Sequence, residues 1–265
     1  MVSQFAQSYE PRHIYFLGRL QAGQKAGMIY VNGDSWSVRM PEATDEQIWP
    51  QLVADRLAQP LKNESVGCAS NSRIHSCLEN FLIQGNRPKL VIIALTGHHR
   101  WHLPAGDMGH WNLGPEVAIC ERTGAKDSLF HRWFWANSYN ELDSVYRYYR
   151  TIWDMNELCR RFGIPCIFFQ AWDEDLAKLN LADSDSIKSY VLQSYESTNI
   201  YYQQYVAGFE FFRNERKNWN YIETPNFEDL LDPAQDIDSS LHPNWRGHGK
   251  IANFVYQHIM ERGLV

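Results

Sequence analysis

The chain has 265 residues, of which 44% are hydrophobic and 21% charged, and its formal net charge is −6. These values are ordinary for a globular protein. The negative charge and the lack of a lysine and arginine cluster exclude the basic face that nucleic acid or an anionic membrane needs, so we expect neither as a partner.

The start of the chain and its cysteines bear on location. The first 20 residues lack a basic start followed by an apolar run of about 7 to 15 residues, so they do not predict a secretory signal. No stretch approaches the roughly 20 apolar residues of a membrane-spanning helix. The five cysteines include no CxxC pair and predict neither a disulfide framework nor a zinc knuckle. We therefore expect a soluble protein that stays in a cytoplasm.

Four apolar runs predict β-strands, at residues 27–31, 65–69, 89–95 and 165–172. Their β-branched and aromatic side chains alternate little with polar ones. That pattern is typical of strands buried on both faces of a parallel sheet.

Helical patterns separate and follow these strands. In residues 44–59 the apolar side chains share one face, and Thr44 with Gln47 is predicted to form a capping box. Residues 138–162 and 247–263 show apolar steps of three and four. Strands that alternate with helices predict an α/β fold with a doubly wound parallel sheet, whose functional crevice lies at the carboxyl ends of the strands.

Two stretches fit this scheme poorly. Residues 98–135 are rich in glycine, histidine and tryptophan, and residues 183–221 contain many tyrosines with one possible helix. The first stretch is predicted to be an aromatic-rich insertion after the third strand, serving as a lid or binding loop. Because no linker or repeat interrupts the chain, we expect one domain over residues 1–265.

The first predicted strand is followed by Gly33, Asp34 and Ser35. A serine hydroxyl just past a strand end is a candidate nucleophile, but it needs a histidine to take its proton and usually an acid to fix the tautomer of that histidine. The candidate base is His242, which lies in a loop before the last predicted helix. Asp34 is expected to organise the turn through its own side chain.

The segments GDSWS (33–37), NESVGCASNSRI (63–74) and HPNWRGHGKIA (242–252) together resemble the blocks of the SGNH, or GDSL-type, hydrolase family, and they occur in the same order. WPQL after the first block and SNSRI in the second are similar to variants carried by bacteriophages. The resemblance implies a flavodoxin-like, three-layer parallel sheet with helices on both faces, and a serine hydrolase that needs no cofactor. A phage origin would further imply association with a virus particle.

By this resemblance, Ser35 is the nucleophile, His242 the base and Asp238 the acid. The family spacing DxxH would put the acid at position 239, where Ser239 stands. A one-residue bulge could aim Asp238 at His242, Asp236 is a fallback, and a dyad that uses a backbone carbonyl is the remaining alternative.

The implied oxyanion donors are the backbone N–H groups of Ser35 and Gly67. The family's third block normally adds an asparagine, but the sequence here is TGHHRW, with His99 at that place. His99, Thr96 or His98 would have to replace the donor; otherwise the two backbone groups act alone. Losing one donor typically costs roughly a hundred- to a thousandfold in rate.

Other side chains have two interpretations each. Asn71 and Arg73 either line the substrate site or cap a helix, and Trp101 with its aromatic neighbours forms either a sugar platform or the core of the lid. His248 is expected to be structural, donating to nearby backbone. His98, His99, His102 and His110 lack the regular spacing of a metal site, so we expect no metal.

The sequence thus predicts a hydrolase that cleaves a carboxylic ester through an acyl-enzyme. The substrate is a small-molecule ester or a glycan ester, such as an acetyl group on a carbohydrate. The alternative is a binding or structural protein that keeps the scaffold without efficient catalysis. Transfer of the acyl group to a sugar instead of water is a third option, and the sequence indicates no oligomeric state.

Overall fold

The computed structural model describes residues 27–39, 43–104, 110–113, 118–120, 126–171, 183–222 and 225–265. A parallel sheet contains five strands, β1 (Ile29–Asn32), β2 (Leu61–Asn63), β3 (Leu90–Leu95), β8 (Cys166–Gln170) and β9 (Tyr221–Ile222). Their order is β2-β1-β3-β8-β9. Counted along the chain this is the 2-1-3-4-5 order of flavodoxin-like sheets. The predicted doubly wound α/β fold is confirmed.

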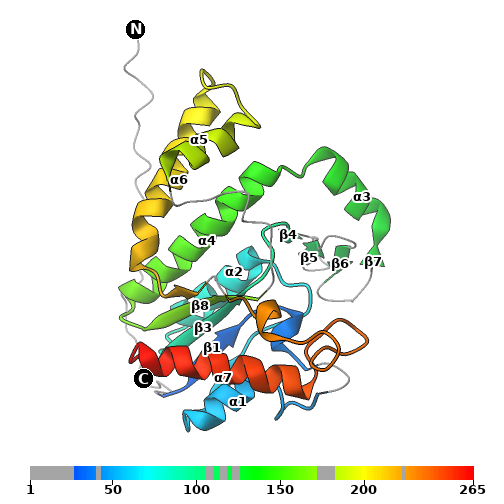
Figure 1. Cartoon of the computed structure of the whole chain (residues 1–265), viewed down its shortest axis with the longest axis vertical. Helices are drawn as coiled ribbons and strands as arrows, with labels where there is room; N and C mark the ends of the chain where they lie inside the picture. The colour runs from blue at the N-terminus through cyan, green and yellow to red at the C-terminus, as the bar shows by residue number, and fades with distance from the viewer. Residues whose placement is uncertain are drawn as a thin grey trace.

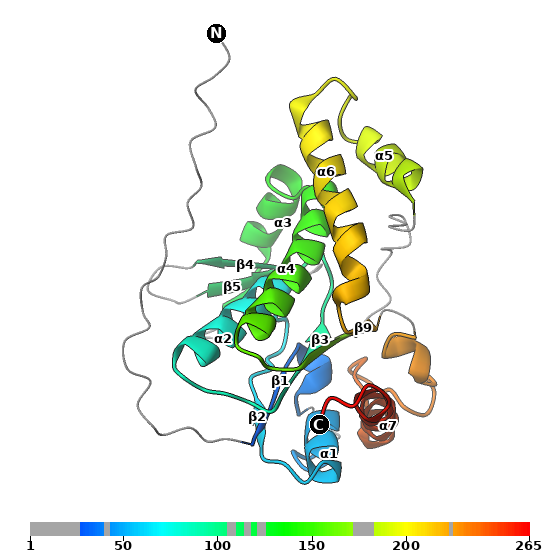
Figure 2. The ribbon, with the colours of Figure 1, turned by 90° about the vertical axis from the view of Figure 1, so that its left-hand side faces the viewer.

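Helices cover both faces of this sheet (Figures 1 and 2). One face carries α1 (Trp49–Arg56) and α7 (Trp245–Glu261), and the other carries α2 (Asn71–Ile83) and α4 (Glu141–Arg161). Beyond α4 lie α5 (Ser184–Leu192) and α6 (Ile200–Glu215), which extend past the sheet. The described residues also include three short 3-10 helices, η1 (Ser35–Ser37), η4 (Arg216–Asn218) and η5 (Glu228–Leu230).

The central strand β3 shows why the apolar runs do not alternate. All six of its residues are fully buried. Leu90, Ile92 and Ala94 pack in the cluster with α1 and α7, whereas the three residues between and after them pack in the cluster with α2 and α4. Both faces of the strand therefore need apolar side chains, and each large one contributes about 1.5–3 kcal/mol by its burial.

The predicted insertion at 98–135 contains more regular structure than a lid or binding loop. A second, antiparallel sheet comprises β4 (Trp101–Pro104), β5 (His110–Leu113), β6 (Ala118–Cys120) and β7 (Lys126–Asp127), and α3 (Ser128–Asn137) follows it. The sequence did not predict these strands because each has only two to four residues, too few to show a period.

Several predicted boundaries are wrong. Residues 65–69 form no strand, because β2 ends at Asn63 and the chain then turns through Cys68, whose φ is +60°. The helix expected at 44–59 begins only at Trp49. Thr44 and Gln47 instead close a turn before it, in which the N–H of Thr44 donates to Oε1 of Gln47 at 2.9 Å.

The long helix predicted at 138–162 is observed as α4. It begins after Asn140, whose side chain accepts a hydrogen bond from Asp143 N–H. It ends before Gly163, whose φ of +66° is the left-handed conformation that stops helices. Within the described ranges, no helix has both the length and the apolar character needed to cross a membrane.

Candidate active site

The turn after β1 is built around the buried carboxylate of Asp34. Its Oδ1 accepts a hydrogen bond from Trp36 N–H at 2.9 Å, so Asp34 caps η1, which begins at Ser35. Its Oδ2 accepts from Thr96 Oγ1 at 2.9 Å and forms an ion pair with Arg100 Nη1 at 3.1 Å. Asp34 is fully buried, so these partners replace the water that its charge has lost. The turn that carries Ser35 is thereby tied to the segment after β3.

Gly33 allows the same turn to approach β3 closely. A Cβ atom at this position would lie 2.6 Å from Ser37 Oγ, 3.0 Å from Ala94 Cβ and 3.1 Å from the Ala94 carbonyl oxygen. These distances leave no room for a larger residue. Ser35 follows two residues later and is itself 8% exposed, at the carboxyl end of β1.

Two of the predicted oxyanion donors are available. The structure records no hydrogen bond from the backbone N–H of Ser35 or of Gly67 to any described residue. Thr96 differs, because its hydroxyl donates to Asp34 and its N–H donates to Asn71 Oδ1 at 3.0 Å. With both of its donors in use, Thr96 leaves only His98 and His99 to replace the family's asparagine.

His98 and His99 lie in a turn that Arg100 N–H closes on the carbonyl of Gly97 at 3.1 Å. The His98 carbonyl accepts a hydrogen bond from Ser144 Oγ at 2.6 Å, which ties the turn to α4. The two imidazole rings are 5.7 Å apart between centroids. Both side chains are half-buried, and the turn that carries them follows the carboxyl end of β3.

The candidate base is held by a backbone carbonyl. Nδ1 of His242 lies 2.7 Å from the carbonyl oxygen of Ser240. A carbonyl can only accept, so Nδ1 carries the proton and Nε2 is left with its lone pair. This is the tautomer that a general base needs, and it matches the dyad alternative left open by the sequence.

Asp238 does not touch the imidazole ring directly; it contacts the backbone of this loop and the Ser240 hydroxyl, whose oxygen lies 3.1 Å from His242 Nδ1. Its Oδ1 accepts from Ser240 N–H at 2.7 Å, from Ser240 Oγ at 2.5 Å and from His242 N–H at 3.1 Å. Burial acts to raise the pKa of this carboxyl, but the hydrogen bonds from Ser240 and His242 outweigh it, so the pKa is lowered. The ionised side chain therefore fixes the loop that presents His242.

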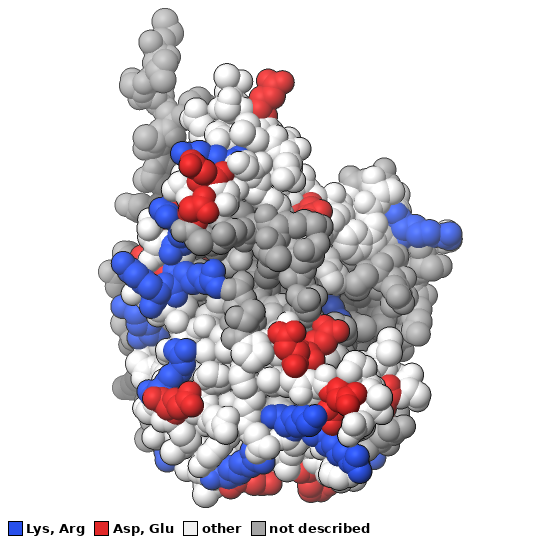
Figure 3. All heavy atoms as spheres, in the orientation of Figure 1, with Lys and Arg blue, Asp and Glu red and all other residues white. Residues whose placement is uncertain are grey.

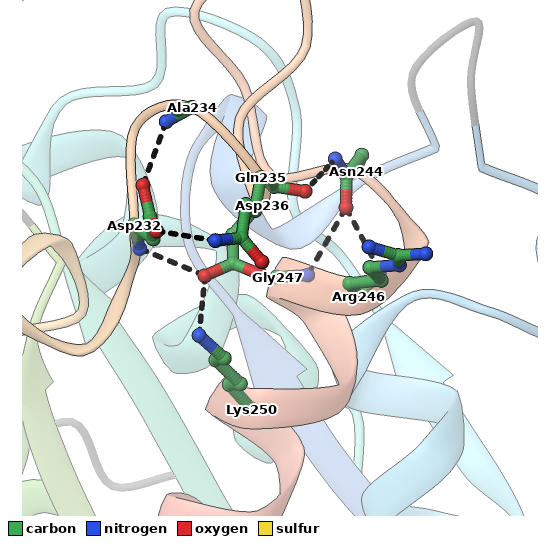
Figure 4. A network of polar contacts seen from close by, with 8 residues as sticks. All are labelled: Asp232, Ala234, Gln235, Asp236, Asn244, Arg246, Gly247 and Lys250. Atoms are coloured by element: carbon green, nitrogen blue, oxygen red, sulfur yellow. Dashed lines mark hydrogen bonds and ion pairs between the residues drawn. The ribbon is translucent and has the colours of Figure 1, made fainter.

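The fallback acid, Asp236, is engaged elsewhere. Its carboxylate pairs with Lys250 Nζ on α7 at 2.5 Å and accepts from Asp232 N–H at 2.7 Å (Figure 4). Its backbone carbonyl accepts from Asn244 N–H, and Asn244 Oδ1 in turn caps the start of α7. Asp236 thus anchors the loop to the helix.

His248 lies fully buried in the first turns of α7. Its Nδ1 accepts from the backbone N–H of Trp49 at 3.4 Å, which joins α7 to α1, so this ring accepts where the sequence predicted a donor. Burial, assisted by the nearby His242, lowers the pKa of His248 to about 4. The ring is therefore neutral near pH 7.

The side chains predicted to contact a substrate make hydrogen bonds to other parts of the protein. Asn71 uses both ends of its amide on the backbone after β3, and Arg73 donates to the carbonyl of Glu64 at 3.2 Å. Trp101 donates to Ser144 Oγ at 3.2 Å and packs in a small aromatic cluster with Phe134. A role of these side chains toward a substrate stays a prediction.

The parts of the chain that the structure describes contain no group of three His, Cys, Asp or Glu side chains that could hold a metal. Because the side chain of His110 lies outside the described residues, the expectation of no metal stays a prediction.

The sequence reasoning missed Arg100, and it left a backbone carbonyl open as the partner of His242 without naming Ser240 as the residue that supplies it. Each acts through a partner that only the fold or the loop geometry supplies. No motif in the sequence marks either of them.

The comparisons with known proteins give a fold but no close relative. No protein-family model matches the chain, and neither does any curated protein. The crystal structure of TesA matches with a TM-score of 0.50 and 14% identity, over 90% of this chain and 99% of TesA.

Two further solved structures are similar. One is an acetyl xylan esterase, Est2A, from the rumen bacterium Butyrivibrio proteoclasticus, with a TM-score of 0.48 and 11% identity over 90% of this chain and 65% of Est2A. The other is a member of the lipolytic G-D-S-L family from Veillonella parvula, with a TM-score of 0.41 and 13% identity over 88% and 96%. At these identities, the likeness to TesA shows a shared fold and nothing more.

Proposed function

We propose that this protein is a serine ester hydrolase of the SGNH kind, which works through an acyl-enzyme. The observation that carries the proposal is the contact between His242 Nδ1 and the Ser240 carbonyl, because it leaves Nε2 as a base. Ser35 at the end of β1 supplies the nucleophile.

The reaction begins when Ser35 Oγ attacks the ester carbonyl carbon and His242 Nε2 takes the hydroxyl proton. The tetrahedral intermediate collapses, the bond to the alcohol oxygen breaks, and His242 returns the proton to that oxygen. A water molecule then attacks the acyl-serine, again giving its proton to His242. The bond between the acyl carbon and Ser35 Oγ then breaks, His242 returns the proton to Oγ, and the acid leaves.

The negative oxygen of the intermediate is bound by the backbone N–H groups of Ser35 and Gly67. Neither group donates to another described residue, so both can donate without first breaking a bond. A ring N–H of His99, or of His98, serves as the third donor. One such donor is typically worth a hundred- to a thousandfold in rate, on the order of 3–4 kcal/mol.

The Ser240 carbonyl takes the orienting role that an acid usually has. It accepts the Nδ1 proton of His242, while Asp238 binds the two backbone N–H groups on either side of that contact. Asp238 is in this scheme a positioning residue, because it acts on the imidazole through the loop.

The substrate class is a carboxylic ester, including an acetyl ester on a carbohydrate. The aromatic side chains near the third-block turn support a sugar-borne ester, since His99 lies 6.5 Å from Trp135 between ring centroids and Trp135 packs on Tyr139 at 4.0 Å. Aromatic faces of this kind bind the apolar side of sugar rings. A profile in which only aryl or lipid esters were cleaved would contradict the sugar preference.

A rival function is that of a binding protein on the same scaffold. One observation favours it, because Ser35 Oγ forms no hydrogen bond to His242 or to any other described residue. In an unliganded enzyme this contact is often loose and forms only with substrate. The two functions therefore need a direct test of serine reactivity.

The test is labelling with a fluorophosphonate probe, read by intact mass. We expect one adduct on the wild type, none on Ser35→Ala and little on His242→Ala. Ser37→Ala is the matched control, since Ser37 lies in the same short helix and is also buried; it should keep the adduct. A folded wild type that gives no adduct would refute catalysis and favour the binding protein.

A further inference from the structure

A groove runs between α1 and α7 on the outer side of that helical layer. It encloses about 640 Å³, within the 300–1,000 Å³ that is common for ligand sites. Its lining includes neither Ser35 nor His242, so it is separate from the proposed catalytic centre. Trp245, one of the lining residues, follows His242 by only three residues.

The groove is positively charged although the chain as a whole carries −6. Arg56, Arg246 and Lys250 line it. Lys250 is neutralised by Asp236, as Figure 4 shows. No carboxylate of the described residues lies within 4.0 Å of the guanidinium of Arg56 or Arg246, so these two cations are available. In the view of Figure 3, Lys and Arg side chains lie over the lower part of the face, among Asp and Glu.

Aromatic rings hold the two arginines in place. The guanidinium carbon of Arg246 lies 5.1 Å from the ring centroid of Trp245, and that of Arg56 lies 6.0 Å from the ring centroid of Tyr256. Such contacts restrict the side chains and leave the N–H forks free for a carboxylate, which arginine binds with two parallel hydrogen bonds.

The other side chains that line the groove can bind a ligand that combines hydroxyl groups with a flat apolar face. Trp245 is 53% exposed, which is high for so large an apolar ring. The amide of Asn253 makes no hydrogen bond with any described residue, and Gln47 uses only its oxygen, on Thr44. Sugars combine hydroxyls with an apolar ring face, and an acidic sugar adds a carboxylate.

Two glycines of α7 differ in what they are needed for. A Cβ at Gly247 would lie 2.5 Å from the carbonyl oxygen of Asp236, so packing requires glycine there. A Cβ at Gly249 would meet no atom within 4 Å. Glycine inside a helix is less stable than alanine, so Gly249 has a cost that packing does not explain. Because Gly249 lines the groove, its missing side chain keeps the floor open.

We propose that the groove between α1 and α7 binds an acidic glycan, with Arg56 and Arg246 on a sugar carboxylate and Trp245 beneath a ring. We add that this glycan is the polymer that bears the ester attacked by Ser35. This addition rests on the proposed function, whereas the binding site does not. Because Trp245 follows His242 by three residues, a glycan ring seated on Trp245 lies close to the loop of His242.

Binding is measured with the full-length Ser35→Ala protein, so that no substrate is consumed. The probes are a panel of carboxylated glycans (oligogalacturonate, alginate and hyaluronan fragments), neutral xylan and galactan fragments, and a single-stranded DNA oligonucleotide. We expect at least one carboxylated glycan to bind and the neutral glycans to bind at least roughly tenfold more weakly. Equal binding of neutral glycans or of DNA, or no binding by the carboxylated panel, would overturn the proposal.

Variants locate the site. Arg56→Gln, Arg246→Gln and Gly249→Leu should each weaken binding of the acidic glycan at least roughly tenfold. The charge-matched control is Arg161→Gln, at the end of α4 on the other side of the sheet, which should bind as before. Gly249→Leu should unfold at the same temperature as the parent or higher, because leucine favours a helix more than glycine does.

The two proposals fail separately. With Ser35 intact, the groove variants should hydrolyse a small aryl acetate at the wild-type rate, since that substrate does not reach the groove. Glycan binding without fluorophosphonate labelling would support the glycan site and refute the proposed hydrolase activity. Labelling without glycan binding would support the hydrolase activity and refute the glycan site.

Discussion

His242 can be oriented either by the Ser240 carbonyl or directly by Asp238. The variants Asp238→Asn and Asp238→Ala distinguish these two possibilities. In the structure, Asp238 Oδ1 accepts from the N–H groups of Ser240 and His242 and does not contact the imidazole. Asparagine keeps an oxygen for both N–H groups, whereas alanine leaves them unpaired. We therefore expect the asparagine variant to stay active and the alanine variant to lose most activity.

The magnitudes follow from the bonds involved. Changing charge-assisted hydrogen bonds to neutral ones costs about 1 kcal/mol each, while two unpaired N–H groups cost about 1–3 kcal/mol each in the stability of the loop. For Asp238→Asn, two such bonds amount to about 2 kcal/mol, which predicts at most about a thirtyfold loss of kcat/KM. If Asp238 were the orienting acid, the loss would be about 10⁴-fold, or about 5 kcal/mol.

The assay is kcat/KM on a small aryl acetate, with the rate constant of fluorophosphonate labelling as a second measure of His242 function. Thermal unfolding of both variants checks that the protein remains folded. A thousandfold or greater loss in Asp238→Asn, with an unchanged unfolding temperature, would refute the carbonyl-oriented dyad. Asp238 would then reach the ring in the working enzyme.

Two further predictions concern stability. The pKa of His248 is lowered from 6.5 to about 4 by burial, so the fold holds the neutral ring, and stability is full above pH 6.5 and falls as the pH drops toward 4. We expect a loss of about 3 kcal/mol that is absent in His248→Gln, by urea unfolding at pH 7 and pH 4; identical pH dependence in both proteins would contradict it. Arg100→Ala should cost about 3–5 kcal/mol by removing the ion pair of the buried Asp34 carboxylate, and Asp34→Asn combined with Arg100→Ala should recover part of it in the same assay.

The sequence by itself determined the class of fold and singled out Ser35 as the candidate nucleophile. Apolar runs without alternation require burial on both faces, and that requirement is a local property of strands such as β3. The turn at Asp34 and the helix end at Gly163 were also predictable, because side-chain capping and a left-handed backbone depend on neighbouring residues.

Only the tertiary structure decided what surrounds that nucleophile. Asp34 and Arg100 are 66 positions apart and meet because β1 and β3 are adjacent strands, a pairing that no local pattern states. The partner of His242 depended on backbone geometry around Ser240, whereas the sequence left Asp238, Asp236 and a backbone carbonyl as alternatives. Short strands such as β7 gain their stability from neighbours in the sheet, so their own residues carry too little pattern to predict them.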